Sequence, residues 1–396
     1  MSVTQLRKKP SVKEMLAGIK VIDVDTHISE WQDLWTSRAP QKIKHLVPRV
    51  QGEGEDRAWV IGDGIFLSSA GAMSAVMKDG SKTKGFDFWK KEIPEVEAAS
   101  YDVGARVKMM DAQGIHAQIA YPNILGFGGQ RAIKVDPELR IASIKIFNDA
   151  MADVYKDSGK RIYPMALLPW WDVDASVAET ERCLKMGLRG INTNPDPQDH
   201  GLPSLGMPHW NRLWECCVAN NVPVNFHIGA SQTSENWFSA GSWPERTMDE
   251  QMVQGGVMLF IGNLRVLGNI LLSRFLENYP TLKIVSVESG IGWIPYLLEA
   301  MEYMAVESGV KFKTPPTEVF RRQIYGCSFF ETRNFATSLR QTGIDNVMFE
   351  TDYPHPACLY PNGLEYMADT IAELTVEERQ KVFSTTAAKL YNIDIS

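Results

Sequence analysis

The stretch Val21-Ile22-Asp23-Val24-Asp25-Thr26-His27 is the most informative part of the sequence about the fold. It is an apolar run that ends with a carboxylate and an imidazole two residues apart. Because residues i and i+2 of a strand point to the same side, Asp25 and His27 would face one place beyond the end of a strand. In a barrel of parallel strands, the C-terminal end of each strand is where the chemistry takes place. The stretch therefore predicts a first barrel strand that carries a candidate pair of metal ligands.

The composition is that of a globular protein. The chain has 396 residues, of which 44% are hydrophobic and 22% charged, so it can bury a large core. A formal charge of −7 without Lys/Arg blocks argues against nucleic acid or an anionic membrane as a partner and favours a small-molecule substrate. Residues 1–20 lack the apolar core of a secretory signal, and the apolar window 255–272 is interrupted by polar residues. We therefore expect a cytoplasmic protein.

Two long segments are interpreted as insertions. Residues 29–100 are irregular and rich in Pro, Gly and charge, and within them 59–61 and 65–67 flank a glycine turn that predicts a β-hairpin. Residues 229–267 form the second insertion, at the expected mouth of the barrel. From Tyr101 onward, amphipathic helices alternate with short apolar strands, the pattern of a parallel sheet with helical crossovers.

Seven further strands are expected along the chain, at 115–120, 162–168, 187–192, 222–227, 282–288, 324–330 and 346–352. Helix signals lie between them: Gly114 can end a helix that begins near Val103, and Thr375 with Glu378 forms a capping box. Eight strands with intervening helices predict an α/β fold, the (β/α)8 TIM barrel, as a single domain over 1–396. An open doubly wound sheet is the alternative, but no glycine-rich phosphate loop follows the first strand.

Four of the expected strands end in potential metal ligands. They are Asp25 and His27 on the first strand, His227 on the fifth, Glu288 on the sixth and Asp352 on the eighth. Each alone has an ordinary explanation, such as a hydrogen-bonded core histidine or a capping carboxylate. Together they predict a divalent metal, because imidazole and carboxylate suit Zn, Fe and Mn, and buried carboxylates need a neutralising cation. Zinc is the first choice, with iron or manganese, mononuclear or dinuclear, as alternatives. His355 is close enough to reach the same mouth as a ligand, as the partner of a ligand or as an acid.

The chain resembles the metal-dependent amidohydrolase superfamily, in the branch of the aminocarboxymuconate-semialdehyde and resorcylate decarboxylases. The resemblance covers most of the chain from Val21 to Tyr391. It rests on four segments: Asp23-Val24-Asp25-Thr26-His27, Asn225-Phe226-His227-Ile228-Gly229, Val287-Glu288-Ser289-Gly290-Ile291-Gly292-Trp293-Ile294-Pro295 and Thr351-Asp352-Tyr353-Pro354-His355.

The resemblance implies a barrel whose metal is held by Asp25, His27, His227 and Asp352. Asp25 occupies a position where many members have His or Glu. Glu288 stands where decarboxylases of this type usually have His. Both departures make the implied site richer in carboxylate.

Three functions are compatible with these residues. The first is a metal-dependent hydrolase or non-oxidative decarboxylase of a small carboxylic acid, amide or aromatic compound, with Asp352, Glu288 and His355 as catalytic groups. The second is a non-haem iron oxygenase, because two imidazoles and several carboxylates around an open position are its ligand set. The third is a non-catalytic or metal-structural subunit of a hetero-oligomeric enzyme. We expect a homodimer or a hetero-oligomer with a related chain.

Side chains at other expected strand ends are candidates for contacts with an aromatic or short-chain organic substrate. They are Tyr121, Asn123, Trp170, Asn192 and Asn194, together with Trp237 in the second insertion. Packing and turn formation are the ordinary roles of such residues.

Overall fold

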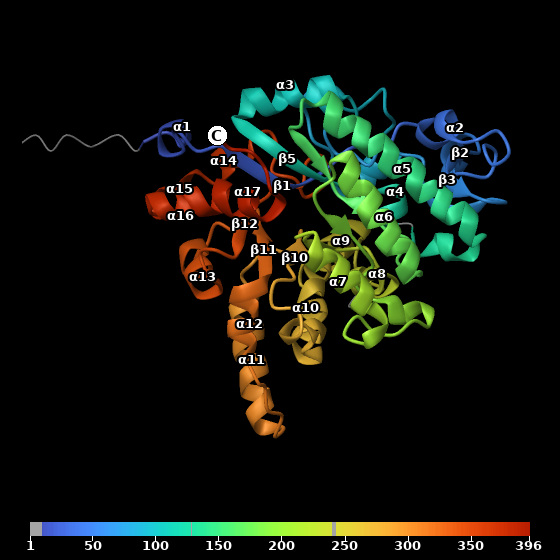
Figure 1. Ribbon diagram of the computed structural model, residues 1–396. Helices are drawn as coiled ribbons and strands as arrows, with labels where there is room; N and C mark the ends of the chain where they lie inside the picture. The colour runs from blue at the N-terminus through green and yellow to red at the C-terminus, as the bar shows by residue number, and fades with distance from the viewer. Residues whose placement is uncertain (1–9, 128, 240–242) are drawn as a thin grey trace, which may run out of the picture.

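The computed structural model describes residues 10–127, 129–239 and 243–396 (Figure 1). Residues 1–9, which belong to the segment used for the localisation prediction, lie outside the described residues. Residues 240–242 of the second predicted insertion lie outside them as well.

Parallel strands at eight positions form the centre of the fold. They are β1 (Val21–His27), β5 (Ile115–Tyr121), β6 (Ile162–Pro164) continued by β7 (Ala166–Leu167), β8 (Ile191–Asn192), β9 (Val224–His227), β10 (Ile284–Val287), β11 (Ile324–Ser328) and β12 (Val347–Phe349). One sheet has the order β1-β5-β6, and a second has the order β12-β11-β10-β9-β8-β7. Neighbouring strands in both sheets are parallel.

The two sheets meet at the third strand of the barrel, which consists of β6 and β7. The N–H of Met165 donates to the carbonyl of Ala120 over 2.8 Å, whereas the next N–H, of Ala166, donates to the carbonyl of Gly190 over 2.9 Å. The predicted strand 162–168 is therefore divided between the two sheets, with β6 in one, β7 in the other and Met165 between them.

Backbone hydrogen bonds also join the first and eighth strand positions. The N–H of Asp352 donates to the carbonyl of Asp25 over 2.9 Å, and the N–H of His27 donates to the carbonyl of Tyr353 over 2.7 Å. The sheets are thus connected at both edges, and the prediction of a (β/α)8 barrel is confirmed. The same bonds bring the polar ends of β1 and β12 together.

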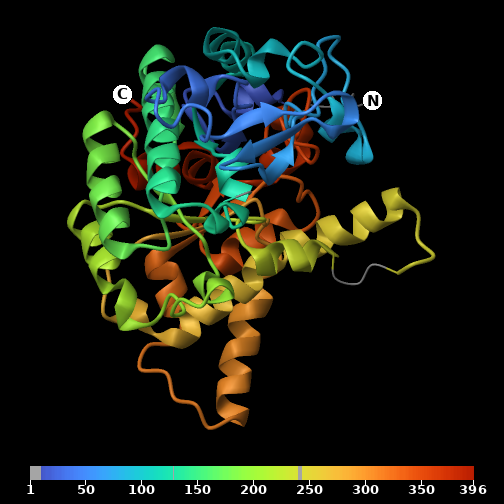
Figure 2. The same ribbon diagram turned by 90° about the vertical axis from the view of Figure 1, so that its right-hand side faces the viewer.

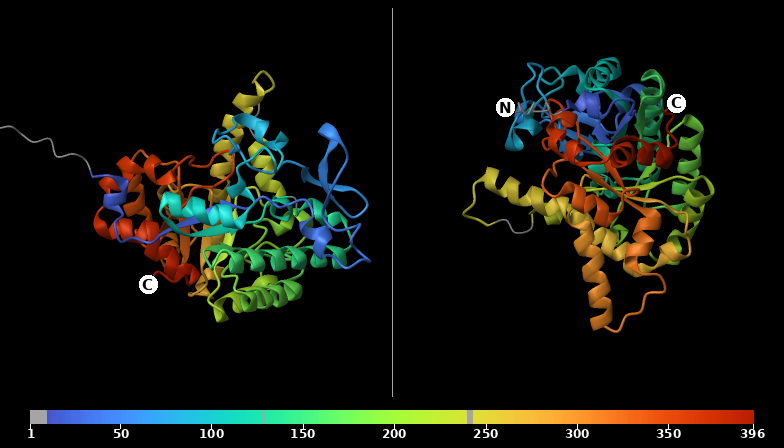
Figure 3. Two further views of the ribbon diagram at one scale, coloured as in Figure 1. Left: turned by 90° about the horizontal axis from the view of Figure 1, so that it is seen from above. Right: turned by 90° about the vertical axis from the view of Figure 1, so that its left-hand side faces the viewer.

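Helices cover the outside of the strands (Figures 1 and 3). Those that connect successive barrel strands, or follow the last one, are α3 (Val103–Gln113), α5 (Pro137–Asp157), α6 (Val173–Met186), α7 (Asn211–Ala219), α10 (Gly262–Ser273), α11 (Ile294–Glu307), α12 (Pro316–Gln323), α13 (Phe335–Thr342), α16 (Val376–Gln380) and α17 (Thr386–Tyr391). Gly114 ends α3 with φ 75°, and Thr375 with Glu378 forms the capping box of α16, both as predicted. The shorter helices are α1 (Val12–Met15), α2 (Leu34–Arg38), α4 (Ile124–Phe127), α14 (Gly363–Tyr366) and α15 (Ala368–Glu373).

The alternation of inward and outward side chains along β9 shows how the strands position the site. Val224 and Phe226 belong to the apolar cluster that packs against the helices. Asn225 and His227 point to the other side of the strand, into the barrel, because side chains alternate between faces. The amide of Asn225 accepts hydrogen bonds from the hydroxyls of Tyr121 and Tyr391, at 3.1 and 2.6 Å. The imidazole of His227 lies two residues further along the strand, at its end.

The first insertion contains an antiparallel sheet of β2 (Arg49–Gln51), β3 (Ala58–Ile61) and β4 (Ile65–Ser69). The predicted hairpin is β3–β4. The third strand, β2, was not predicted because three residues with polar ends carry no alternation signal.

The second insertion forms α8 (Gln232–Ser239) and α9 (Met248–Phe260). Figure 2 shows the yellow α8–α9 segment and the orange α11 extending away from the barrel. The run Met248–Ser273, which contains α9 and α10, is by length and composition apolar enough to cross a membrane, and 39% of its most apolar window is buried. Within this run, α10 places four apolar side chains in the core: Val266, Leu267, Ile270 and Leu271. The core helix of a globular protein can meet the same length and composition criteria.

Candidate metal centre

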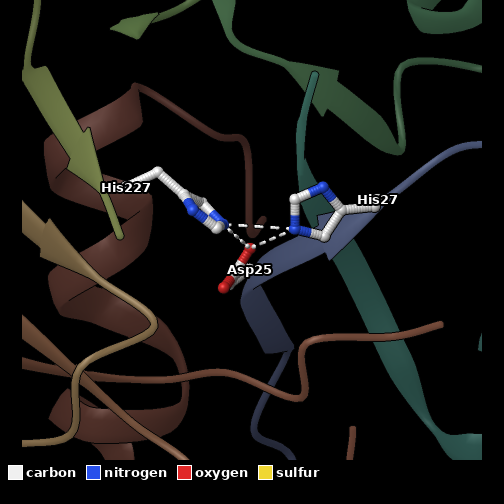
Figure 4. Close-up of side chains that lie close together, drawn as sticks. All are labelled: Asp25, His27 and His227. Atoms are coloured by element: carbon white, nitrogen blue, oxygen red, sulfur yellow. Dashed lines mark hydrogen bonds and ion pairs between the residues drawn. The ribbon is translucent and has the colours of Figure 1, made fainter. Parts of the chain in front are cut away.

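Three of the predicted ligands meet where β1 and β9 end. Figure 4 shows Asp25, His27 and His227 pointing toward one another. The two Nε2 atoms of the histidines are 3.2 Å apart, and each lies 3.6 Å from Oδ1 of Asp25. Ligands bound to one ion at 2.0–2.2 Å lie roughly 2.8–3.6 Å from each other. The spacing of these three side chains therefore fits a common divalent cation.

The sixth and eighth strand positions bring two more carboxylates to the same place. Oδ1 of Asp352 is 3.7 Å from Nε2 of His27, and Oε2 of Glu288 is 3.5 Å from Nε2 of His227. Both acidic residues follow their strands with a left-handed backbone, φ 57° at Glu288 and φ 59° at Asp352. Such conformations are uncommon outside glycine and cluster at functional sites. The turns aim both carboxylates at the histidines.

The carboxylates of the centre are buried and short of hydrogen bonds. Asp25 and Asp352 are 0% exposed, and neither oxygen of either side chain has a hydrogen-bond partner among the described residues. An unpaired buried carboxylate costs several kcal/mol, by an order-of-magnitude argument, and a bound cation removes that cost. The residues present therefore fit a divalent metal ion.

A backbone contact sets the direction of the His227 ring. Its Nδ1 lies 2.7 Å from the carbonyl of Ile228, an atom that can only accept, so Nδ1 carries the hydrogen. Nε2 is then the atom that faces Asp25 and His27, in the orientation that a metal-bound imidazole needs.

The carboxylates and imidazoles shift one another's pKa. Burial lowers the pKa of His227, but the nearby charges of Asp25 and Glu288 outweigh it and raise the value to about 9. Burial, and then the charge of Asp352, raises the pKa of Glu288 well above its usual range. Burial and the neighbouring His355 and His227 hold the pKa of His27 well below its usual range. In the protein without metal, protons occupy part of this carboxylate-rich centre.

Two buried carboxylates near the centre were missed from the sequence. Glu350 is 0% exposed and its Oε2 accepts the N–H of Glu288 at 3.3 Å, while its Oε1 has no partner among the described residues. Asp23 accepts hydrogen bonds from Thr351 and Gln118, and burial raises its pKa to about 7. Both stand two residues before a predicted ligand, so the i, i+2 rule applied once more along each strand would have found them.

A large apolar cavity of about 1050 Å³ opens above the centre. The polar residues at its floor are Asn123, Glu288, Asp352 and His355. Its walls come from β4, residues 82–89, α4, α8 and α9, and they include Phe66, Leu67, Met73, Phe86, Phe88, Trp89, Phe127, Ile228, Phe238, Val257 and Phe260. The site can thus hold a ligand with an apolar body and a polar group directed at the metal ligands.

The predicted substrate contacts are placed as follows. Asn123 lines the cavity. The ring of Tyr121 lies 5.1 Å from that of His227, with its hydroxyl bonded to Asn225. The described lining of the cavity does not include Tyr121 or the other four predicted contacts, Trp170, Asn192, Asn194 and Trp237. The cavity lies under α8, α9 and the first insertion, whereas Trp170 packs beside Trp171 and His200.

Comparison with known proteins identifies the relatives of this chain. The gamma-resorcylate decarboxylase of Rhizobium sp. (strain MTP-10005) is 22% identical over 350 residues, which are 83% of this chain and 98% of that protein. The crystal structure of an amidohydrolase from Mycobacterium avium subsp. paratuberculosis K-10 has a TM-score of 0.74 at 20% identity, covering 95% of this chain and 99% of that one. A dihydroxybenzoic acid decarboxylase from Polaromonas sp. JS666, with bound manganese and the inhibitor 2-nitroresorcinol, has a TM-score of 0.62 at 18% identity, covering 96% and 98%.

Fold and site together define a metal-dependent enzyme of the hydrolase and lyase kind, built on a (β/α)8 barrel. The family model for amidohydrolases matches residues 22–393. The chain belongs to the amidohydrolase family, as its sequence motifs suggested. The Rhizobium and Polaromonas proteins are named as decarboxylases and the Mycobacterium protein as an amidohydrolase, so none of these relatives supports the oxygenase alternative.

Proposed function

We propose that the protein is a metal-dependent, non-oxidative decarboxylase of a carboxylic acid with an apolar, aromatic body. The observation that carries the proposal is the buried histidine and carboxylate cluster at the floor of an apolar cavity. The names of the Rhizobium and Polaromonas relatives support decarboxylation of an aromatic acid.

The metal is a divalent cation held by Asp25, His27, His227 and Asp352. When bound, it would supply a positive charge that holds the substrate carboxylate and polarises it. Zinc was expected from the ligand types, but the Polaromonas neighbour was solved with manganese, so both ions should be tested.

Glu288 is the proton donor in this proposal. Its side chain lines the cavity, and burial raises its pKa well above the usual range, which favours the protonated form that a donor needs. In the reaction, the bond between the substrate carbon and its carboxylate breaks, and the electron pair remains on that carbon as CO2 leaves. The proton of Glu288 then forms the new C–H bond, and Glu288 takes up a proton from water afterwards.

The cavity indicates the size of the substrate. A volume of about 1050 Å³ is at the upper end of the roughly 300–1000 Å³ of pockets for drug-sized ligands. The aromatic side chains of its walls exclude water from the proton donor and favour a flat, apolar molecule. We expect a substrate with more than one ring, or with an apolar side chain on the ring.

The test is CO2 release by the metal-loaded enzyme from a panel of aromatic carboxylic acids, in air and without oxygen. The expected product carries one deuterium from D2O at the carbon that lost the carboxylate, and its rate does not depend on oxygen. Glu288→Gln should lower the rate by about 100-fold or more while metal content is kept. Oxygen-dependent turnover, or hydrolysis without CO2, would refute the proposal.

A further inference from the structure

The turn after β10 carries Glu288, the proton donor of the proposed reaction. Glu288 and Gly290 both have a left-handed backbone, with φ 57° and φ 67°, and α11 begins shortly afterwards at Ile294. A left-handed backbone is unfavourable for a residue with a Cβ, so Glu288 keeps this conformation only where contacts from the surrounding structure stabilise it. Because the side chain of Glu288 leaves from this backbone, its direction depends on those contacts.

Glu331, which follows the end of β11, supplies such contacts. Its carboxylate accepts the N–H of Ile291, which lies 2.9 Å from each oxygen, and the N–H of Gly292, which lies 2.6 Å from Oε1. The hydroxyl of Ser328, the last residue of β11, donates to Oε2 at 2.9 Å. The carboxylate of Glu331 therefore connects the end of β11 to the turn after β10.

Two glycines allow this carboxylate to lie directly against the turn. A Cβ at Gly290 would lie 3.0 Å from the carboxyl carbon of Glu331, and a Cβ at Gly292 would lie 3.0 Å from its Oε1. Both distances are shorter than ordinary van der Waals contact, so a side chain at either position would push the carboxylate away from the backbone N–H groups. The contact between Glu331 and the turn thus depends on both glycines.

Glu331 lies behind the turn, away from the space for a ligand. The described lining of the cavity includes Glu288 but not Glu331. A second carboxylate, that of Glu350, accepts the N–H of Glu288 itself at 3.3 Å, which is long for a hydrogen bond. The bonds from Ile291 and Gly292 to Glu331 are shorter, so Glu331 makes the stronger of these two links between the turn and a neighbouring strand.

We propose that Glu331 is a positioning residue, which holds the turn 288–292 so that the carboxyl group of Glu288 faces the floor of the cavity. This role rests on the proposed function, because Glu288 is the proton donor only in that reaction. A proton donor must lie within hydrogen-bond reach of the atom that receives the proton. Loss of the Glu331 carboxylate would let the turn relax and move the donor, while the cavity walls that bind the substrate stay in place.

The kinetic test compares Glu331→Ala with Glu331→Gln. The substrate is the aromatic acid of the panel above that the unaltered, metal-loaded enzyme decarboxylates fastest. Glu331→Ala should lower kcat by about tenfold or more, with KM and metal content nearly unchanged. Glu331→Gln should restore most of kcat, because the oxygen of a glutamine can still accept the backbone N–H groups. Glu299→Ala, on the exposed face of α11, is the matched control and should keep the full rate.

Hydrogen exchange followed by mass spectrometry tests the turn without any substrate. In Glu331→Ala, the peptide that contains Ile291 and Gly292 should exchange about tenfold faster or more than in the unaltered protein, whereas peptides from β10 should keep their rate. Ser328→Ala keeps the carboxylate of Glu331 and removes one of its hydrogen bonds. It should show the same changes to a smaller extent, and it provides the test if Glu331→Ala does not fold.

The outcomes separate the two proposals. Unchanged kcat in Glu331→Ala, with a large loss in Glu288→Gln, would overturn the role of Glu331 and leave the proposed decarboxylase standing. A lower melting temperature with unchanged kcat per folded enzyme would also overturn it, because Glu331 would then only stabilise the fold. Unchanged exchange in the turn would overturn it whatever the kinetics. If the unaltered protein released CO2 from no acid, the proposed function would fall, and faster exchange in Glu331→Ala would still support the hold of Glu331 on the turn.

Discussion

Nε2 of His27 and Nε2 of His227 lie 3.2 Å apart in the barrel mouth, although the two residues are 200 positions apart in the chain. His227 uses its other nitrogen to bond the carbonyl of Ile228. Two such nitrogen atoms approach closely only when a proton or a cation lies between or beside them. The pair is therefore the first place to test for metal.

Removal of ligands on β1 should remove the metal. We expect the double substitution Asp25→Ala, His27→Ala to lower bound metal to background, because it deletes two of the donors that surround the Nε2 atom of His227. Elemental analysis of the purified protein measures this. His45→Ala, a change in an exposed segment, is the control and should keep its metal. Full metal content in the double variant would show that the ion binds elsewhere.

Metal affinity should increase with pH. Because the pKa of His227 is raised to about 9 without metal, a cation must displace its proton at neutral pH. For each proton released on binding, the apparent affinity for the metal should fall by about tenfold with every pH unit below 9. Above pH 9 it should no longer depend on pH. Calorimetry at pH 7 in two buffers with different ionisation enthalpies counts the protons, and we expect at least one. A count of zero would mean that His227 is already neutral.

Asp352→Asn should abolish turnover and leave the fold intact. Asparagine tolerates the left-handed backbone of this position, φ 59°, but its amide is a poorer metal ligand than a carboxylate. We expect at least about a 100-fold loss of turnover with an unchanged circular dichroism spectrum. Asp345→Asn is the matched control, because Asp345 is exposed and pairs with Lys381 far from the centre. Retained turnover in Asp352→Asn would exclude Asp352 from the machinery.

Asn225 should be important for stability. It accepts the hydroxyls of Tyr121 and Tyr391 and donates to the carbonyl of Ile191 at 2.9 Å, all inside the barrel. Asn225→Ala leaves these buried groups unpaired, so we expect a loss of about 2–4 kcal/mol in the free energy of unfolding. Denaturant unfolding measures this. Asn220→Ala, on an exposed residue, should cost clearly less, and equal losses would contradict the argument.

The barrel and the positions of most candidate ligands could be predicted from the sequence alone. Apolar runs separated by amphipathic helices define strand and helix locally, and the i, i+2 rule places Asp25 and His27 together without knowledge of any other segment. The location of His227 at the end of β9 followed from the same pattern. The roles of these ligands, the single domain and the cytoplasmic location stay predictions.

The arrangement of these side chains relative to one another could be seen only in the three-dimensional structure. The stacking of His27 on His355, the contact between His355 and Asn123 and the burial of Glu350 depend on contacts between distant segments. The same holds for the cavity, whose walls come from both insertions. Local sequence patterns report the direction of a side chain within its own element. They do not report which side chain of another element faces it, and that relation determines the charge of the site and the space for a substrate.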